Sequence, residues 1–253
     1  GYVSVLNGPG GLGGAVNLVT RKPSKPVEAE IEARVGGDRD LSYNSYGLTG
    51  LLGGRWGDVY AQASGAVLDR EEWTLPGDFA PTALEDGGER DFSASTDTRW
   101  NLKAGWTPNA TDEYALSYIR ADGRKDVPLH VSDTASARFW DWPYWDISSL
   151  YFLSRTRLGE GLEVRTRGYL NTFDNLLAAY DDGSQSVQSL PRAFNSFYAD
   201  EAWGGNVTLE AQLSADASLT GALFFRRDRH DERQDGFVRV PASGAPFDNR
   251  AYS

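Results

Sequence analysis

The sequence predicts an all-β protein whose strands form a transmembrane antiparallel β-barrel. Three observations predict this: short segments that alternate apolar and polar residues, short turns that alternate with long polar loops, and a composition rich in glycine and aromatic residues. The 253 residues include 28 glycines, 8 tryptophans and 12 tyrosines, with neither cysteine nor methionine. No run of 18 apolar residues is present, which excludes a transmembrane helix. Strands of a membrane barrel alternate instead, and so keep the mean hydropathy low.

The first 26 residues are predicted to form two short strands around a glycine turn. A β-branched run at 3–6 ends in the chain-reversing segment 7–11. A second run at 15–20 is stopped by Pro23, because proline cannot donate to a strand ladder. Residues 8–13 also satisfy the G-x-G-x-x-G dinucleotide fingerprint, which requires a helix from Ala15 onward. The β-branched residues that follow favour a hairpin, and a nucleotide-dependent enzyme stays as a disfavoured alternative.

Alternating strands are predicted from residue 28 to about residue 225. In residues 28–35, Ile31 and Val35 share one face while Glu30 and Glu32 share the other. Such a strand fits between lipid and a polar lumen. Residues 147–158 and 162–174 are predicted to form two further strands. The apolar positions of the remaining six segments are, in chain order, Tyr46, Leu48 and Leu52; Val59, Ala61, Ala63 and Val67; Trp100, Leu102, Ala104 and Trp106; Tyr114, Leu116 and Tyr118; Val207, Leu209, Ala211 and Leu213; and Leu219, Leu223 and Phe225.

The connections between these strands alternate strictly between short and long. The short turns contain glycine, proline, asparagine or aspartate and are predicted at 53–58, 107–112, 158–161 and 214–218. The long polar loops are predicted at 70–95, 121–146 and 175–196. Short turns on one side and long loops on the other are typical of outer-membrane barrels, and soluble sandwiches rarely carry such loops. Trp106 and Tyr114 flank one turn on the apolar face, where an interfacial aromatic girdle is expected.

The glycine-rich start of the chain closely resembles the C-terminal end of the plug domain in TonB-dependent outer-membrane receptors. The matching positions, in order and without gaps, are Ser4-Val5-Leu6, Gly8, Pro9, Gly13, Gly14, Asn17, Val19, Thr20, Lys22 and Pro23. A looser similarity continues through 173–182 and 197–205. The resemblance implies that 1–26 end a plug domain and that 27–253 form the N-terminal part of the barrel. About nine strands would belong to a larger barrel, so the chain is expected to be an internal fragment.

The resemblance also implies a function. Receptors of this family import a scarce ligand, typically a ferric siderophore or another iron complex, across the outer membrane of Gram-negative bacteria. The expected partners are therefore outer-membrane lipid, a ferric siderophore or similar ligand, and the TonB complex, reached through the region before residue 1. A porin-like barrel or a surface carbohydrate-binding β-protein, without energised transport, remains the alternative.

Composition and residue spacing argue against several other functions. A net charge of −11 is opposite to a nucleic-acid footprint. The only histidines, His130 and His230, lack a paired ligand spacing and are expected to be solvated, so neither a metal nor a cofactor is predicted. Asp181 and Asp182 are adjacent and lack the spaced oxygens of a calcium loop. Residues 69–97 carry nine acids and two arginines, which we interpret as a solvated surface. No catalytic arrangement stands out, so no enzyme is predicted.

One aromatic cluster remains as a candidate site. It lies at a predicted loop-to-strand junction and comprises Phe139, Trp140, Trp142, Tyr144 and Trp145. These side chains are expected either to contact a ligand or to anchor the outer aromatic girdle.

Overall fold

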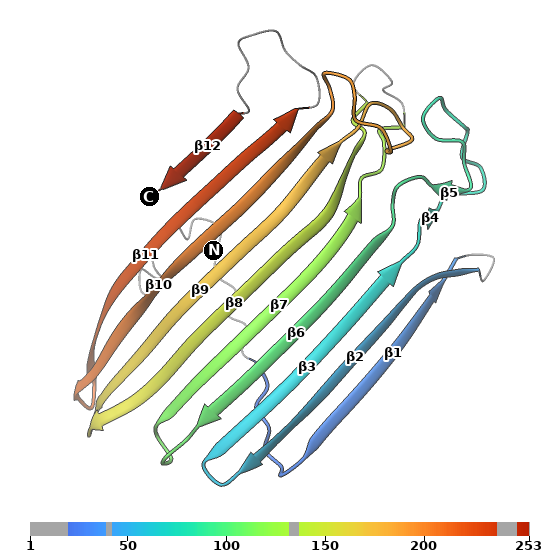
Figure 1. Cartoon of the computed structure of the whole chain (residues 1–253). Coiled ribbons are helices and arrows are strands. Elements are labelled where there is room, and N and C mark those ends of the chain that lie inside the picture. The colour runs from blue at the N-terminus through green and yellow to red at the C-terminus, as the bar shows by residue number, and fades with distance from the viewer. Residues whose placement is uncertain (1–19, 39–41, 132–136, 237–246, 253) are drawn as a thin grey trace.

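The structure is a computed structural model that describes residues 20–38, 42–131, 137–236 and 247–252. The described residues form strands, turns and loops and contain no helix, so none could cross a membrane as a helix. This described part of the chain contains twelve strands (Figure 1): β1 (Glu28–Gly37), β2 (Tyr43–Trp56), β3 (Val59–Arg70), β4 (Trp73–Thr74), β5 (Glu89–Arg90), β6 (Ser95–Trp106), β7 (Glu113–Asp126), β8 (Trp140–Gly159), β9 (Leu162–Ala179), β10 (Phe194–Ser214), β11 (Ala217–Gly236) and β12 (Phe247–Tyr252).

Ten of these strands form one open antiparallel sheet in the order β1-β2-β3-β6-β7-β8-β9-β10-β11-β12. Each strand pairs with its neighbours along the chain, and β1 and β12 lie at opposite edges (Figure 1). The all-β prediction is confirmed, and the open sheet matches part of a β-barrel. All nine predicted strands are present. Strand β12 and the small β4–β5 hairpin, which lies within the connection between β3 and β6, were not predicted.

One face of the sheet is apolar and exposed. Leu52, Leu102 and Leu116 are 61%, 50% and 50% exposed, far more than leucines in the core of a soluble protein. The register places Leu52 opposite Ala63, and Ala63 opposite Leu102. This apolar face therefore has the composition of a lipid-facing surface.

The predicted aromatic pair beside the turn at 107–112 is confirmed. Trp106 and Tyr114 are register partners, and their ring centroids lie 5.6 Å apart. The opposite face, called the polar face below, carries residues such as Tyr60, Lys103 and Glu113.

The connections confirm the predicted asymmetry and correct its extent. Short turns join β2 to β3, β6 to β7, β8 to β9 and β10 to β11 at one end of the sheet (Figure 1). Gly57 and Gly161 adopt positive φ values of 59° and 70° in two of these turns, which favours glycine. The long loops occupy 71–94, 127–139 and 180–193, so the second and third are shorter than predicted.

The two loops were overestimated because charged residues interrupt the apolar pattern near the loop ends of β7, β8 and β9. Asp122, Asp146 and Asp174 follow one another across the sheet in register. Main-chain pairing continues through them, so the strands extend although the apolar alternation has stopped. Strand β8 runs for 20 residues and β10 for 21.

Candidate functional site

The segment that leads into β1 lies on the polar face near the short-turn end. The Lys103 Nζ donates a hydrogen bond to Thr20 Oγ1 at 2.6 Å, and Lys22 forms an ion pair with Glu113. Pro23 is buried, and its carbonyl accepts a hydrogen bond from Arg55 Nε at 3.2 Å. Residues 20–23 thus contact β2, β6 and β7, three strands that are far apart in sequence.

Tyr60 is the centre of this contact region. Its side chain is fully buried at 0% exposure, and its hydroxyl donates to Glu113 Oε1 at 2.6 Å. The Arg55 guanidinium lies 5.0 Å from the ring centroid and the Lys103 ammonium 5.9 Å from it, within range of cation–π attraction. The ring occupies the space above Gly105, where a Cβ would overlap it. The region therefore combines one buried aromatic ring with paired charges.

The glycine-rich motif is only partly open to comparison with the structure. Gly8, Pro9, Gly13, Gly14 and Asn17 lie outside the described residues. Thr20, Lys22 and Pro23 are described, and all three contact the sheet. Their partners were not identified from the sequence, because nothing in it brings β2, β3, β6 and β7 into register. The one available signal in the sequence was that the residues next to Ala61 and Leu102, which point to the other face of each strand, are polar.

The predicted aromatic cluster lies at the start of β8 and divides between the two faces. Trp145 contacts Trp142 and Phe173 at centroid distances of 5.6 and 5.0 Å. Trp145 and Phe173 lie on the polar face. Tyr144, which precedes Trp145 in the strand, therefore points to the apolar face. A register irregularity between Asp141 and Tyr144 accommodates the extra residue.

The remaining members of the cluster lie nearer the loops. Trp140 contacts Phe194 of β10 at 6.4 Å, and the Arg138 guanidinium lies 5.4 Å from its ring. The Phe139 carbonyl accepts a hydrogen bond from the Tyr180 amide at 2.8 Å. The structure thus forms two separate aromatic contacts, one between Trp140 and Phe194 and one that joins Trp142 and Trp145 to Phe173. Phe173 and Phe194 were not among the residues predicted for this cluster.

The same polar face carries His230, which is not simply solvated as predicted. Phe173 pairs with Asp200, and Asp200 pairs with His230, so the three follow one another across β9, β10 and β11. His230 Nδ1 lies 2.5 Å from Asp200 Oδ1, and Nε2 lies 3.8 Å from Glu232 Oε2. The sequence pattern did not predict this contact, since Asp200 is 30 residues away from His230.

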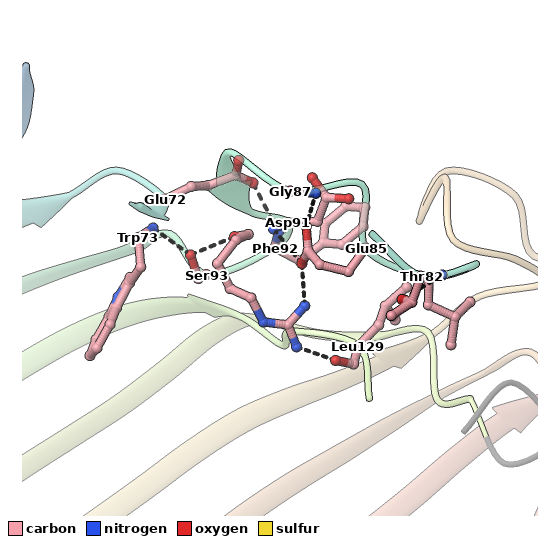
Figure 2. A network of polar contacts seen from close by, with 11 residues as sticks. Glu72, Trp73, Thr82, Glu85, Gly87, Asp91, Phe92, Ser93 and Leu129 are labelled. Atoms are coloured by element: carbon pink, nitrogen blue, oxygen red, sulfur yellow. Dashed lines mark hydrogen bonds and ion pairs between the residues drawn. The ribbon is translucent and has the colours of Figure 1, made fainter. Parts of the chain in front are cut away.

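The acidic loop 71–94 contains a buried carboxylate, which corrects the prediction of a wholly solvated surface. Glu85 is 2% exposed and pairs with Arg90, whose guanidinium also donates to the Leu129 carbonyl (Figure 2). Arg90 thereby joins the loop after β3 to the loop after β7. The buried Glu85 carboxylate is tolerated because it is paired with Arg90 and also accepts a hydrogen bond from the Asp91 amide at 3.3 Å.

Glu85, Asp86 and Asp91 form the one carboxylate group among the described residues that is close enough to suggest a cation, with oxygens within 4.8 Å of one another. Burial raises the pKa of Asp91, and the neighbouring Glu85 and Asp86 raise it further. Glu85 is already paired with Arg90, so we interpret the group as part of the loop contact. Phe92 follows with a φ of 59°, and its amide donates to Glu72 Oε1 at 2.9 Å (Figure 2).

The loop 180–193 closes on Asp181. This carboxylate is 6% exposed and accepts hydrogen bonds from the Ser189 amide, the Ser189 hydroxyl at 2.6 Å and the Leu190 amide at 2.8 Å. Burial raises the pKa of Asp181, but these hydrogen bonds outweigh it and hold the pKa below its usual value. Asp182 makes a smaller set of contacts, chiefly with the Ser184 amide at 2.9 Å.

Replacing Asp181 with asparagine is expected to open this loop, because an amide cannot accept all of these bonds as an anion does. Hydrogen exchange of the 180–193 amides should rise about tenfold at pH 7. The lowered pKa means that the ionised carboxylate stabilises the closed loop above its unfolded pKa, and that this stabilisation is lost as pH falls through the folded pKa. The exchange rates of the wild-type amides, compared at equal pH, should therefore approach those of the variant below about pH 3.9. Asp182→Asn is the matched control, and equal effects of both would contradict the assignment.

Comparisons with known proteins support the fold. A scan of protein-family models and a search of curated proteins each found no match. Among solved structures, the copper transporter OprC matches with a TM-score of 0.64 and 15% sequence identity. The match covers 92% of this chain and 34% of the OprC chain, so the chain spans about a third of that structure's length. At this identity the likeness establishes a shared fold.

Proposed function

We propose that this chain is part of a TonB-dependent outer-membrane receptor. The observation that carries the proposal is the contact of residues 20–23 with Lys103, Glu113 and Arg55 on the polar face. A segment held there, at the short-turn end, fits a plug whose last residues, up to 26, turn directly into the first barrel strand. The apolar face and the fold shared with OprC support an outer-membrane location.

The resemblance of the first 23 residues to a plug end favours energised import over passive diffusion. In a porin-like barrel the lumen stays open, whereas here the polar face holds residues 20–23 through Lys103, Glu113 and Arg55. A carbohydrate-binding sandwich would bury the sheet face that is exposed here, since Leu52 is 61% exposed. The dinucleotide alternative needs a helix after Ala15, and from residue 20 onward the described residues contain none.

The proposed cargo is a scarce metal complex. The family resemblance points to a ferric siderophore or another iron complex, and the aromatic cluster around Trp145 offers apolar contact area for such a ligand. A copper-containing ligand is the second candidate, because the structural neighbour is a copper transporter. The ligand would enter from the long-loop end, past Trp140 and Trp145.

Deletion of the full-length gene in its Gram-negative host is expected to abolish energised uptake of one metal complex. Radiolabelled iron–siderophore and copper uptake should be measured under starvation for each metal, with the gene restored in trans. Uptake should also vanish when TonB is removed, because a plugged barrel conducts nothing without mechanical work. Uptake that survives loss of TonB would favour the porin-like alternative.

A further inference from the structure

His230 lies between two carboxylates on the polar face, close to the long-loop ends of the strands. Nδ1 is 2.5 Å from Asp200 Oδ1 on the adjacent strand β10, and Nε2 is 3.8 Å from Glu232 Oε2 on its own strand. The side chains of His230, Asp200 and Glu232 are 40%, 38% and 22% exposed, so the group is open to solvent from the polar face. The centroid of the Tyr198 ring lies 6.0 Å from that of the imidazole.

The contact with Asp200 determines which nitrogen of the neutral imidazole is free. An ionised carboxylate only accepts hydrogen bonds, so at 2.5 Å the Nδ1 atom of His230 carries the proton and donates it. The lone pair of the neutral ring then lies on Nε2, on the side of Glu232. Carboxylate, histidine and an open Nε2 in this order are the arrangement by which proteins orient metal-binding histidines.

The distance between Nε2 and the Glu232 oxygen suits a metal ion held between them. Nitrogen and oxygen ligands bind at 2.0–2.2 Å, and in a tetrahedral site two such ligands lie about 3.3 Å apart. The observed 3.8 Å differs from this by about half an ångström, which a small rotation of the half-buried Glu232 side chain would cover. Residues two apart in a strand share a face, so the strand itself directs both donors the same way.

We propose that His230 and Glu232 form a two-donor site for a divalent transition-metal ion, with Asp200 as the positioning residue. Imidazole with a carboxylate suits Zn²⁺ and Cu²⁺, and among divalent ions the affinity is highest for Cu²⁺. The other coordination positions stay open to water or to the molecule that carries the metal. The proposal deepens the proposed function: it rests on the same polar face and adds a point where a metal cargo contacts the wall.

Charges around the pair favour a cation. Asp200 lies opposite His230, and Asp228 lies on the same face two residues before it. Asp228 pairs with Arg226 at 2.8 Å, so we assign it no ligand role. The carboxylate group at Glu85 differs in this respect, because Arg90 already neutralises its buried member and no imidazole is present.

The test is Cu²⁺ binding by the full-length protein in detergent. Calorimetry measures the affinity, and electron paramagnetic resonance identifies the ligands. Wild type should bind one Cu²⁺ whose spectrum carries coupling to imidazole nitrogen, and His230→Gln should lose it. Glu232→Gln should weaken binding while keeping the nitrogen coupling. Asp200→Asn should weaken binding by about 10- to 100-fold, the usual effect of removing an orienting carboxylate. The matched control is His130→Gln, which removes the other histidine and should bind as wild type does.

The proposal is overturned if His230→Gln binds Cu²⁺ with the wild-type affinity and spectrum, or if His130→Gln loses the same ion. Each variant is checked for folding by its shift between heated and unheated gels. If His230→Gln fails that check, Glu232→Gln and Asp200→Asn decide the matter. Binding is measured at equilibrium without TonB, so loss of energised uptake with intact Cu²⁺ binding would count against the proposed function alone.

Discussion

Gly105→Ala is expected to destabilise the folded protein by about 3 kcal/mol or to prevent folding. A Cβ at Gly105 would overlap the Tyr60 ring, which is fully buried and cannot rotate away without breaking its hydrogen bond to Glu113. Overfilling a packed site costs about 1–3 kcal/mol. Moving the Tyr60 ring would also disturb Glu113, which forms an ion pair with Lys22. The urea midpoint of the full-length protein measures the effect.

Gly168→Ala is the matched control for this experiment. Gly168 is also a strand glycine, but a Cβ there meets nothing within 4 Å, so stability should stay unchanged or rise slightly. The double variant Gly105→Ala with Tyr60→Ala tests the cause, because it removes the ring that the new methyl group meets. Equal stability of Gly105→Ala and Gly168→Ala would refute the packing of Tyr60 described above.

The 253-residue polypeptide, produced alone, is expected not to form a heat-resistant barrel in detergent or lipid. Among the described residues the sheet is open, since β1 and β12 lie at its opposite edges and each pairs with a single neighbour. Unpaired main-chain groups are each costly in a membrane, by several kcal/mol, and a strand edge exposes a row of them. After refolding, unheated and heated samples should migrate alike on gels, and a trypsin digest should leave no protected core.

A discrete band on unheated gels, lost on boiling, would contradict this expectation. The control is the full-length gene product refolded in the same detergent, which should give the heat-sensitive shift. The comparison also separates two causes of failure, since a detergent unsuited to refolding would affect both proteins.

Much of the fold was predictable because strand alternation is a local property. Ala61 and Ala63 share one face with Leu102, and the structure places all three on the apolar face as expected. The strand ends near Asp122 and Asp146 were not predictable in the same way. Beyond the apolar band both faces of a strand become polar, so the sequence of a strand there is indistinguishable from that of a loop.

The candidate sites depended on register, which the sequence does not display. Thr20 and Lys22 were identified by their motif, yet their partners Lys103 and Glu113 lie more than 80 residues further along the chain. His230 gave no signal for a different reason. Glu232 is only two residues away on the same strand, but Asp200, the residue that orients the imidazole, is a cross-strand neighbour 30 residues earlier in the chain.

Strand length in this sheet implies a rim of uneven height. Strands β2 and β3 have 14 and 12 residues, while β8 and β10 have 20 and 21. At about 3.3 Å per residue and the tilt of about 40° that is usual in barrels, the longer strands rise roughly 20 Å further along the barrel axis. The mouth of the barrel would then be a slope, low beside β2 and β3 and high beside β8 to β10. A solute that enters over the short strands would therefore face the longer ones, which carry Trp145 and His230.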